Sequence, residues 1–158
     1  MTDKYRPLKD AFGRFATGIA VATCQNDDGR MTAITVNSFT SVSLEPPLVL
    51  WCLDNRASTY SAFMSSDSYG VSILRADQRT ESDRFAHFAG PDITEEEIER
   101  WDTGAPILKE RLAGFDCKLV ARHDAGDHVI LIGEVVKFDS VVGEPLVYFS
   151  SNYIPDSE

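Results

Sequence analysis

The pattern of apolar and polar positions begins with one helical segment and then changes to strands. Apolar residues recur at the helical spacing i, i+3, i+4, i+7 at Leu8, Ala11, Phe12 and Phe15. This spacing predicts a helix with one apolar face. Pro7 suits its first turn, and Gly18 is placed to end it.

Three apolar, β-branched segments follow at 19–24, 31–43 and 48–53. The turn Asn26–Gly29 separates the first two and predicts a hairpin, with Gly29 supplying a positive φ. Two prolines break the chain before 48–53. The continuous apolarity of 48–53 predicts a strand that is fully buried.

The remaining segments alternate short helices with strands. We expect a helix at about 59–64, a strand at 69–74, a helix capped by Asp77 that carries Phe85 and Phe88, long strands at 115–123 and 129–138, and a last strand at 145–149. Thr94 and Glu97 have the spacing of a capping box. About seven strands and three or four short helices predict a small antiparallel barrel, with residues 1–158 forming one domain.

Charge narrows the classes of partner. The 158 residues include 15 Lys and Arg against 25 Asp and Glu, a net charge of −10. The mean field of such a protein repels nucleic acid and anionic membranes, so we expect neither as a partner. A local site for one phosphate is compatible with this charge.

Cysteine use and hydropathy indicate the compartment. Cys24, Cys52 and Cys117 form no CxxC pair, and an odd, low count suits a reducing cytosol. The longest apolar run has six residues, whereas about 20 are needed to span a bilayer. We therefore expect a soluble cytoplasmic protein without a metal site.

Most sequence motifs of catalysis are missing from the chain. It has no GxGxxG, GxSxG or HExxH motif, and the residues after Gly13 and Gly18 do not complete a P-loop. His87 and His123 are expected in surface or packing roles. His128 differs, because it starts a strand beside a Gly-Asp turn, where a side chain is held firmly at a barrel rim.

Polar residues fill both faces of the segment Thr35–Ser43. It is either an ordinary edge strand or a strand that lines a planar polar ligand with backbone amides and short side chains. Downstream, 56–59 opens a helix with an Arg and two hydroxyls, which favours a phosphate. Together the two segments indicate a phosphorylated heterocycle.

The order of several segments resembles the flavin reductase-like proteins of the FMN-binding split-barrel fold. These are the small NAD(P)H:flavin oxidoreductase components of two-component flavin monooxygenases. The resemblance covers about residues 8–153 and is carried by 12–18, 35–50, 72–78, 82–86, 125–128, 132–135, 145–149 and Tyr153. It departs from the family pattern at Ala33, Ser72 and Glu81.

The resemblance implies a mainly β, homodimeric split barrel with a flavin lying across it. It implies cofactor contacts by Thr35, Val36, Asn37, Ser38, Ser41, Cys52, Leu53, Asp54, Ser58, Thr59, Arg84, Phe85 and Tyr153. His128 matches a residue beside the flavin ring, where the nicotinamide stacks.

The activity implied is hydride transfer from NADH or NADPH to N5 of FMN or FAD, with reduced flavin passing to a partner monooxygenase. His128 would position the rings rather than react covalently. Two alternatives remain open on the same barrel. One is a non-catalytic FMN-binding electron carrier, motivated by Ala33 and Ser72, and the other is an FMN-dependent oxidase.

Overall fold

A computed structural model describes residues 2–86, 93–154 and 156. His87 and Phe88 therefore lie outside the described residues. The helical elements are α1 (Arg6–Phe12), α2 (Tyr60–Ser65), α3 (Arg79–Ala86) and the 3-10 turn η1 (Glu95–Glu97). The strands are β1 (Thr17–Gly18), β2 (Ala20–Gln25), β3 (Met31–Val36), β4 (Thr40–Leu44), β5 (Pro47–Asp54), β6 (Ser68–Ile73), β7 (Ile98–Arg100), β8 (Pro106–Leu108), β9 (Ala113–Ala125), β10 (His128–Ser140), β11 (Val147–Phe149) and β12 (Asn152–Ile154).

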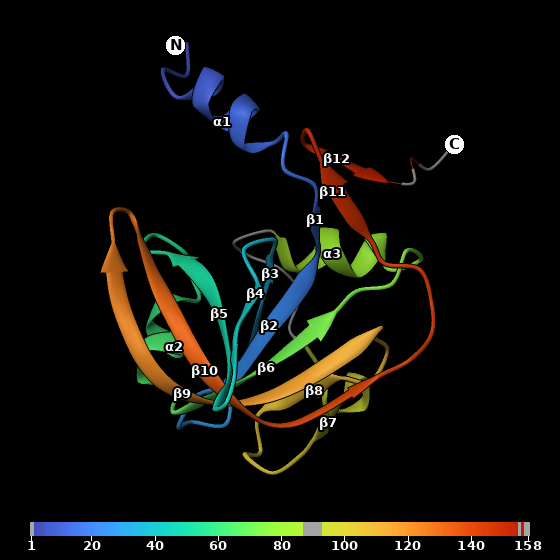
Figure 1. The fold of residues 1–158 in the computed structure, drawn as a ribbon. Helices are drawn as coiled ribbons and strands as arrows, with labels where there is room; N and C mark the ends of the chain where they lie inside the picture. The colour runs from blue at the N-terminus through green and yellow to red at the C-terminus, as the bar shows by residue number, and fades with distance from the viewer. Residues whose placement is uncertain (1, 87–92, 155, 157–158) are drawn as a thin grey trace.

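Seven strands form one antiparallel sheet in the order β3-β2-β6-β9-β10-β5-β4, which curls into the expected split barrel (Figure 1). The long hairpin β9–β10 spans the sheet and carries two register shifts, which help it to bend. The turn before Met31 has Gly29 at φ +85°, so the hairpin predicted there is confirmed.

The segment expected as one strand over 31–43 is two strands. β3 and β4 lie at opposite edges of the sheet, joined only by residues 37–39. The Ser38 hydroxyl draws the chain away from β2, since it accepts a hydrogen bond from the Cys52 N–H (2.9 Å) and donates one to the Cys52 carbonyl (3.3 Å). Val36 and Thr40 can be at most roughly 14 Å apart, so the two edges must approach each other here.

Two apolar clusters hold the sheet. One contains Trp51, whose ring meets Phe63 of α2 and Tyr69 of β6 edge-on. The other lies under α3 and contains Phe85 and Leu146. β5 is not buried on both faces as expected, because exposure alternates along it and only Val49, Trp51 and Leu53 reach the core.

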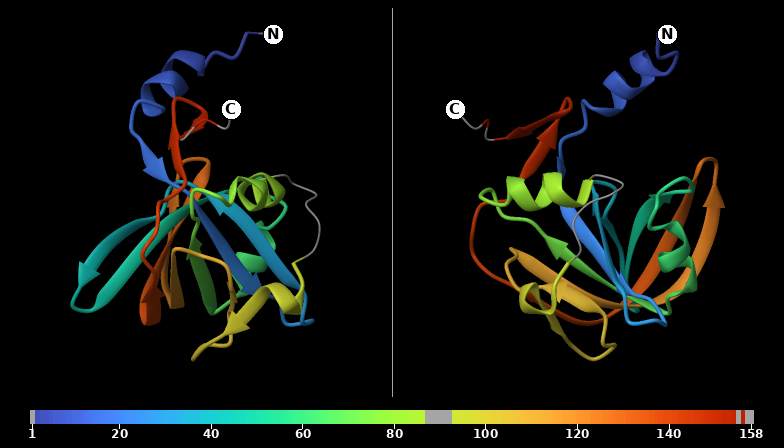
Figure 2. Two further views of the ribbon diagram at one scale, coloured as in Figure 1. Left: turned by 90° about the vertical axis from the view of Figure 1, so that its right-hand side faces the viewer. Right: turned by 180° about the vertical axis from the view of Figure 1, so that it is seen from behind.

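The first helix projects from the barrel instead of packing on it (Figure 2). α1 ends at Phe12, and Gly13 rather than Gly18 is its C-cap, while Gly18 lies in β1. None of its residues is buried. β1 pairs with β11, and β11 with β12, in a small sheet beside this helix. Leu8, Ala11 and Phe12 of the predicted apolar stripe lie exposed on this helix, whereas Phe15 lies beyond its end, so the prediction of one helical face over all four residues is only partly correct.

Two local predictions have different outcomes. The Thr94 N–H donates to Oε2 of Glu97 (2.8 Å), so the capping spacing there is confirmed, around one 3-10 turn. Asp77 does not cap α3, which begins at Arg79; its Oδ1 instead accepts from Nε of Arg75 (3.0 Å). Among the described residues, no helix has the length and apolarity to cross a bilayer.

Candidate functional site

One rim of the barrel is formed by the end of β5, the loop after it and the start of β10. His128 stands directly opposite Asp54 in the β5–β10 register. Nδ1 of His128 is 2.7 Å from Oδ1 of Asp127. The N–H of Asn55 donates to the Asp127 carbonyl (3.0 Å), which ties the β9–β10 turn to the loop after β5. The strand-start position predicted for His128 is confirmed, and the rim holds it in place.

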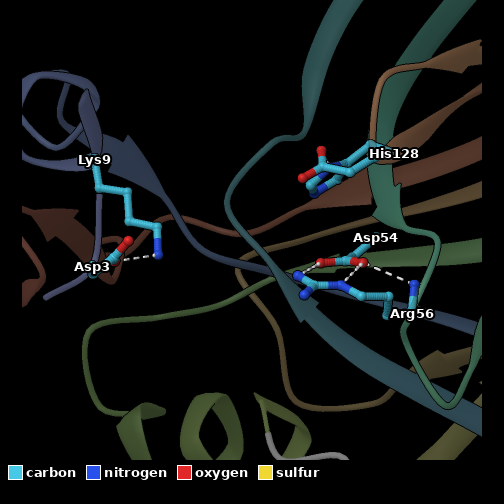
Figure 3. A network of polar contacts seen from close by, with 6 residues as sticks. Asp3, Lys9, Asp54, Arg56 and His128 are labelled. Carbon is cyan, nitrogen blue, oxygen red and sulfur yellow. Dashed lines mark hydrogen bonds and ion pairs between the residues drawn. The ribbon is translucent and has the colours of Figure 1, made fainter. Parts of the chain in front are cut away.

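Asp54 and Arg56 form an ion pair on this rim (Figure 3). The Asp54 carboxylate accepts from the Arg56 backbone N–H (2.8 Å), from Nε (3.2 Å) and from the second guanidinium nitrogen (3.0 Å). Hydrogen bonds from Arg56, with a smaller contribution from the nearby His128, lower the pKa of Asp54 to about 2. Arg56 is therefore balanced by a carboxylate and is not a free cation for a phosphate.

Cys52 faces the same side of β5 as Asp54, because side chains two apart share a face of a strand. Its thiol is half-buried, and burial raises its pKa above the usual value. A raised thiol pKa makes thiolate chemistry unfavourable at neutral pH, so Cys52 fits a lining role.

A second group joins β3 to α3 and to β12. The Thr35 hydroxyl donates to the Ser82 carbonyl (2.7 Å). The Tyr153 hydroxyl donates to Oδ1 of Asp83 (3.0 Å), which leaves the Ser82 hydroxyl to donate to the Tyr153 oxygen (2.7 Å). The Arg79 guanidinium lies 4.9 Å from the centroid of the Tyr153 ring. The hydroxyls of Thr35 and Tyr153 thus both hold α3 in place.

Arg84 and Phe85 lie at the end of α3. Phe85 is buried in the cluster under this helix. The Arg84 guanidinium stacks on the Phe85 ring (4.7 Å to the centroid) and forms an ion pair with the Glu97 carboxylate. A phosphate at Arg84 would therefore have to share it with Glu97.

The remaining predicted residues differ in what they can offer a ligand. The side chains of Val36 and Leu53 are in the core, so only their backbone groups could contact a cofactor. Ser41 and Ser58 are exposed. Thr59 precedes α2, and its Oγ1 is buried without a hydrogen-bond partner among the described residues.

Asn37 lines a cavity of about 210 Å³ that the sequence did not indicate. Its other lining residues are Lys9, Phe12, Gly13, Phe15, Thr17, Tyr148 and Ser151. Oγ1 of Thr17 is buried and has no partner among the described residues. Phe12 and Phe15 were visible in the sequence as an apolar stripe, but that pattern by itself predicts core packing.

The donor set suits a planar polar ring and a phosphate. Short hydroxyl and amide side chains dominate the segments 35–38 and 58–59. The hydroxyls of Thr17 and Thr59 are buried without hydrogen-bond partners among the described residues. Unpaired buried hydroxyls are costly unless a ligand or water completes their hydrogen bonds. At the rim, Asp127 is the carboxylate that contacts His128 directly.

Comparisons with known proteins identify the family of the chain. Residues 12–155 match the model of the flavin reductase like domain. The chain is 40% identical over 143 residues to an FMN reductase (NADH), SmoA, of Agrobacterium fabrum, covering 90% of this chain and 81% of that protein.

Two solved structures are similar over most of their length. The styrene monooxygenase flavin reductase of Pseudomonas putida has a TM-score of 0.84 and 32% identity, with 92% of this chain and 94% of that one covered. The NADH:FAD oxidoreductase SgcE6 of Streptomyces globisporus, in complex with NAD and FAD fragments, has a TM-score of 0.86 and 29% identity, with 100% and 99% covered. The chain belongs to the flavin reductase-like family.

Proposed function

We propose that this protein reduces FMN or FAD with NADH or NADPH and supplies the reduced flavin to a partner monooxygenase. The observation that carries the proposal is the composition of the rim. It contains His128, the polar ends of β3 and β5, and the loop before α2, and the chain belongs to this family. When bound, the two nucleotides supply the chemistry, a hydride transfer from the nicotinamide C4 to the flavin N5. The chain's own residues bind the two nucleotides, orient them and exclude water from between them.

The flavin would be held mainly by neutral groups. We assign its ring edge to the segment Thr35–Ser38 with Ser41, and its chain and phosphate to Cys52–Asp54 and to Ser58 and Thr59. The buried, unpartnered Oγ1 of Thr59 supports the phosphate end. We assign the opposite wall of the flavin site to Arg84, Phe85 and Tyr153. Their side chains already bond to or pack against α3 and its neighbours, so they would shape this wall.

His128 would position the nicotinamide. Its side chain is 40% exposed at the rim, so one edge of the imidazole is open to a ligand while Nδ1 faces Asp127. A side chain fixed in this way lowers the barrier to hydride transfer by holding the nicotinamide and flavin rings in position, and it requires no covalent step.

The active unit is a homodimer in this proposal. Phe12 and Phe15 are 69% and 79% exposed and lie on the projecting helix α1 or just after it. Large side chains grouped on an arm that leaves the barrel are typical of an interface with another chain. The same two residues line the cavity beside Asn37, so the site and the interface share this region.

The electron-carrier alternative rested partly on Ser72, and the structure gives this residue another task. Ser72 is fully buried in β6, and its hydroxyl accepts the Leu108 N–H (3.1 Å), which anchors β8 to the sheet. Its departure from the family pattern therefore concerns packing and does not weaken the reductase assignment.

The test is steady-state turnover over a matrix of NADH and NADPH against FMN, FAD and riboflavin. Consumption of the reduced nucleotide in proportion to added flavin is expected. No turnover with any pair would overturn the proposal, and tight FMN that copurifies without exchanging would favour the electron carrier. Peroxide formation from an organic substrate without a nicotinamide would favour the oxidase. The three cysteines are all free, which suits the cytoplasmic location that is part of this proposal.

A further inference from the structure

We propose that Asp127 is a positioning residue that fixes the tautomer of His128, so that Nε2 presents a lone pair to the nicotinamide carboxamide. The inference rests on the role proposed above for His128. It gives Asp127 a role that the sequence did not assign to it, and it gives a direction for the hydrogen bond that His128 makes.

A carboxylate can only accept hydrogen bonds, and Oδ1 of Asp127 lies 2.7 Å from Nδ1 of His128. Nδ1 must therefore carry the hydrogen. In the neutral imidazole the other nitrogen, Nε2, is then an acceptor. The hydrogen bond from His128 lowers the pKa of Asp127, which keeps this carboxylate ionised at neutral pH.

Asp127 and His128 are neighbours in the sequence, and their side chains nevertheless meet. Adjacent side chains in a strand point to opposite faces, but β10 begins only at His128, and Asp127 belongs to the turn. Gly126 has φ +66°, a left-handed conformation that reverses the chain before Asp127. The bond from the Asn55 N–H to the Asp127 carbonyl then fixes the turn.

The other acidic neighbour of His128 is already occupied by Arg56. Asp54 stands opposite His128, but its carboxylate already accepts three hydrogen bonds from Arg56 (Figure 3). Oδ1 of Asp127 contacts the imidazole directly and has no competing side-chain donor in the part of the chain that the structure describes. The two carboxylates therefore have different roles. Asp54 stabilises the loop after β5, and Asp127 holds the imidazole ring of His128.

An acceptor at Nε2 matches one chemical feature of the co-substrate. The nicotinamide carboxamide carries an NH₂ group, which can donate to Nε2. The opposite tautomer would offer a donor there, and two facing donors repel. The tautomer thus selects the orientation of the carboxamide in which its NH₂ group faces His128.

The experiment uses the full-length chain with ¹⁵N-labelled histidine and two substitutions, Asp127→Ala and Asp127→Asn. The Asn side-chain oxygen can still accept from Nδ1, so Asp127→Asn is the conservative rescue. Asp124→Ala is the matched control, because it removes the same charge from an exposed position of the same hairpin. The His128 signals are identified by their loss in His128→Gln.

The ¹⁵N shifts of neutral His128 should show hydrogen on Nδ1 in the wild type, in Asp127→Asn and in Asp124→Ala, and a move toward Nε2 in Asp127→Ala. The KM for NADH should rise about tenfold in Asp127→Ala, the size expected for losing one charge-assisted hydrogen bond, and flavin affinity should stay within about twofold. Asp127→Asn should restore the KM.

Three results would overturn the inference: hydrogen on Nε2 in the wild type, a KM unchanged in Asp127→Ala, or an Asp127→Asn variant as impaired as Asp127→Ala. The tautomer is measured without turnover. A chain that shows the Nδ1 hydrogen but reduces no flavin would therefore refute the proposed function separately.

Discussion

At the scale of single residues, the site consists of short polar groups, most of which already have a partner in the protein. Ser38 bonds to the Cys52 backbone, Thr35 to Ser82, and Arg84 to Glu97. Few side chains are therefore held in reserve for a ligand. The ring of His128 is partly exposed. A substitution there should therefore affect ligand binding more selectively than a substitution at Ser38, Thr35 or Arg84, whose side chains also hold the protein's own structure together.

His128→Ala should raise the KM for NADH about tenfold or more and leave the dissociation constant of FMN within about threefold, because the imidazole orients the nicotinamide rather than the flavin. Stopped-flow reduction and fluorescence titration of FMN measure the two effects. His123→Ala is the control, since His123 is exposed on the neighbouring strand β9. Equal losses of NADH use and FMN binding in His128→Ala would contradict the assignment.

Glu97 provides a pH-dependent contribution to stability. Its hydrogen bonds with Arg84 lower its pKa from the ordinary 4.5 to about 2. Because the folded state lowers this pKa, the stabilisation is fully present above about pH 4.5 and is lost as the pH falls towards 2. The side chain is 34% exposed, so after allowance for solvent screening we expect about 1 kcal/mol at pH 7.

Urea unfolding of Glu97→Gln between pH 7 and pH 3 measures this contribution. The variant should be less stable than the wild type at pH 7, and the difference should shrink below pH 4.5. Glu96→Gln is the control, as Glu96 is exposed in the same turn. A difference between Glu97→Gln and wild type that stays constant down to pH 3 would show that the lost carboxylate charge is not the cause.

At the scale of elements, the sequence was most informative where one local pattern decided the structure. The hairpin at Gly29, the long hairpin β9–β10 and the position of His128 at its base follow from turn residues and alternation. The division of 31–43 into β3 and β4 does not, since it depends on a hydrogen bond between Ser38 and Cys52, fourteen positions away. The short strands β1, β7, β8 and β12 also escaped prediction, because their pairing partners, not their own two or three residues, define them.

Gly133 in β10 leaves room for the Tyr69 side chain, which comes from β6. A Cβ at this position would lie 2.3 Å from the hydroxyl oxygen of Tyr69 and 3.0 Å from Cβ of Cys117. Gly133→Ala should therefore destabilise the protein by about 2–3 kcal/mol in urea unfolding, through overpacking of the core.

Two further variants check the cause of that loss. Gly18→Ala should change stability by less than about 0.5 kcal/mol, because no atom lies within 4 Å of its Cβ. Combining Gly133→Ala with Tyr69→Phe should recover part of the loss, since the nearest atom is removed. No recovery would mean that strain elsewhere in the strand is responsible.

The projecting helix α1 should control assembly. We expect a dimer at micromolar concentration for the wild type and a monomer for the double variant Phe12→Ser, Phe15→Ser, measured by sedimentation velocity, because the exposed apolar surface of the arm is lost. Asp10→Asn, which changes only an exposed ion pair with Arg6, is the control and should remain dimeric. A monomeric wild type would contradict the proposed interface.

At the scale of the whole molecule, the net charge of −10 opposes every anionic ligand that the proposed function requires. The arrangement of the site fits this constraint. Hydroxyls, backbone groups and paired arginines surround it, so binding would depend on short-range hydrogen bonds while the long-range field remains repulsive.

Salt should therefore improve the use of charged substrates. Raising NaCl from about 20 to about 200 mM should lower the KM for FMN about two- to threefold, because the repulsive field is screened within roughly 10 Å. Riboflavin, which has no phosphate, is the matched control, and its KM should not change. An increase in the KM for FMN with salt would instead indicate a dominant local positive charge.

The short bridge of residues 37–39 has a consequence for the order of folding. It links the two edges of a sheet whose other five strands are contributed by residues 20–25, 47–54, 68–73 and 113–140. The edges can meet only after those distant segments have assembled, and such non-local closure is slow. The candidate site spans both edges, with Thr35 in β3 and Ser38 bonded to β5, the neighbour of the edge strand β4, so the newly made chain should acquire its ability to hold a cofactor last, after most of its secondary structure has formed.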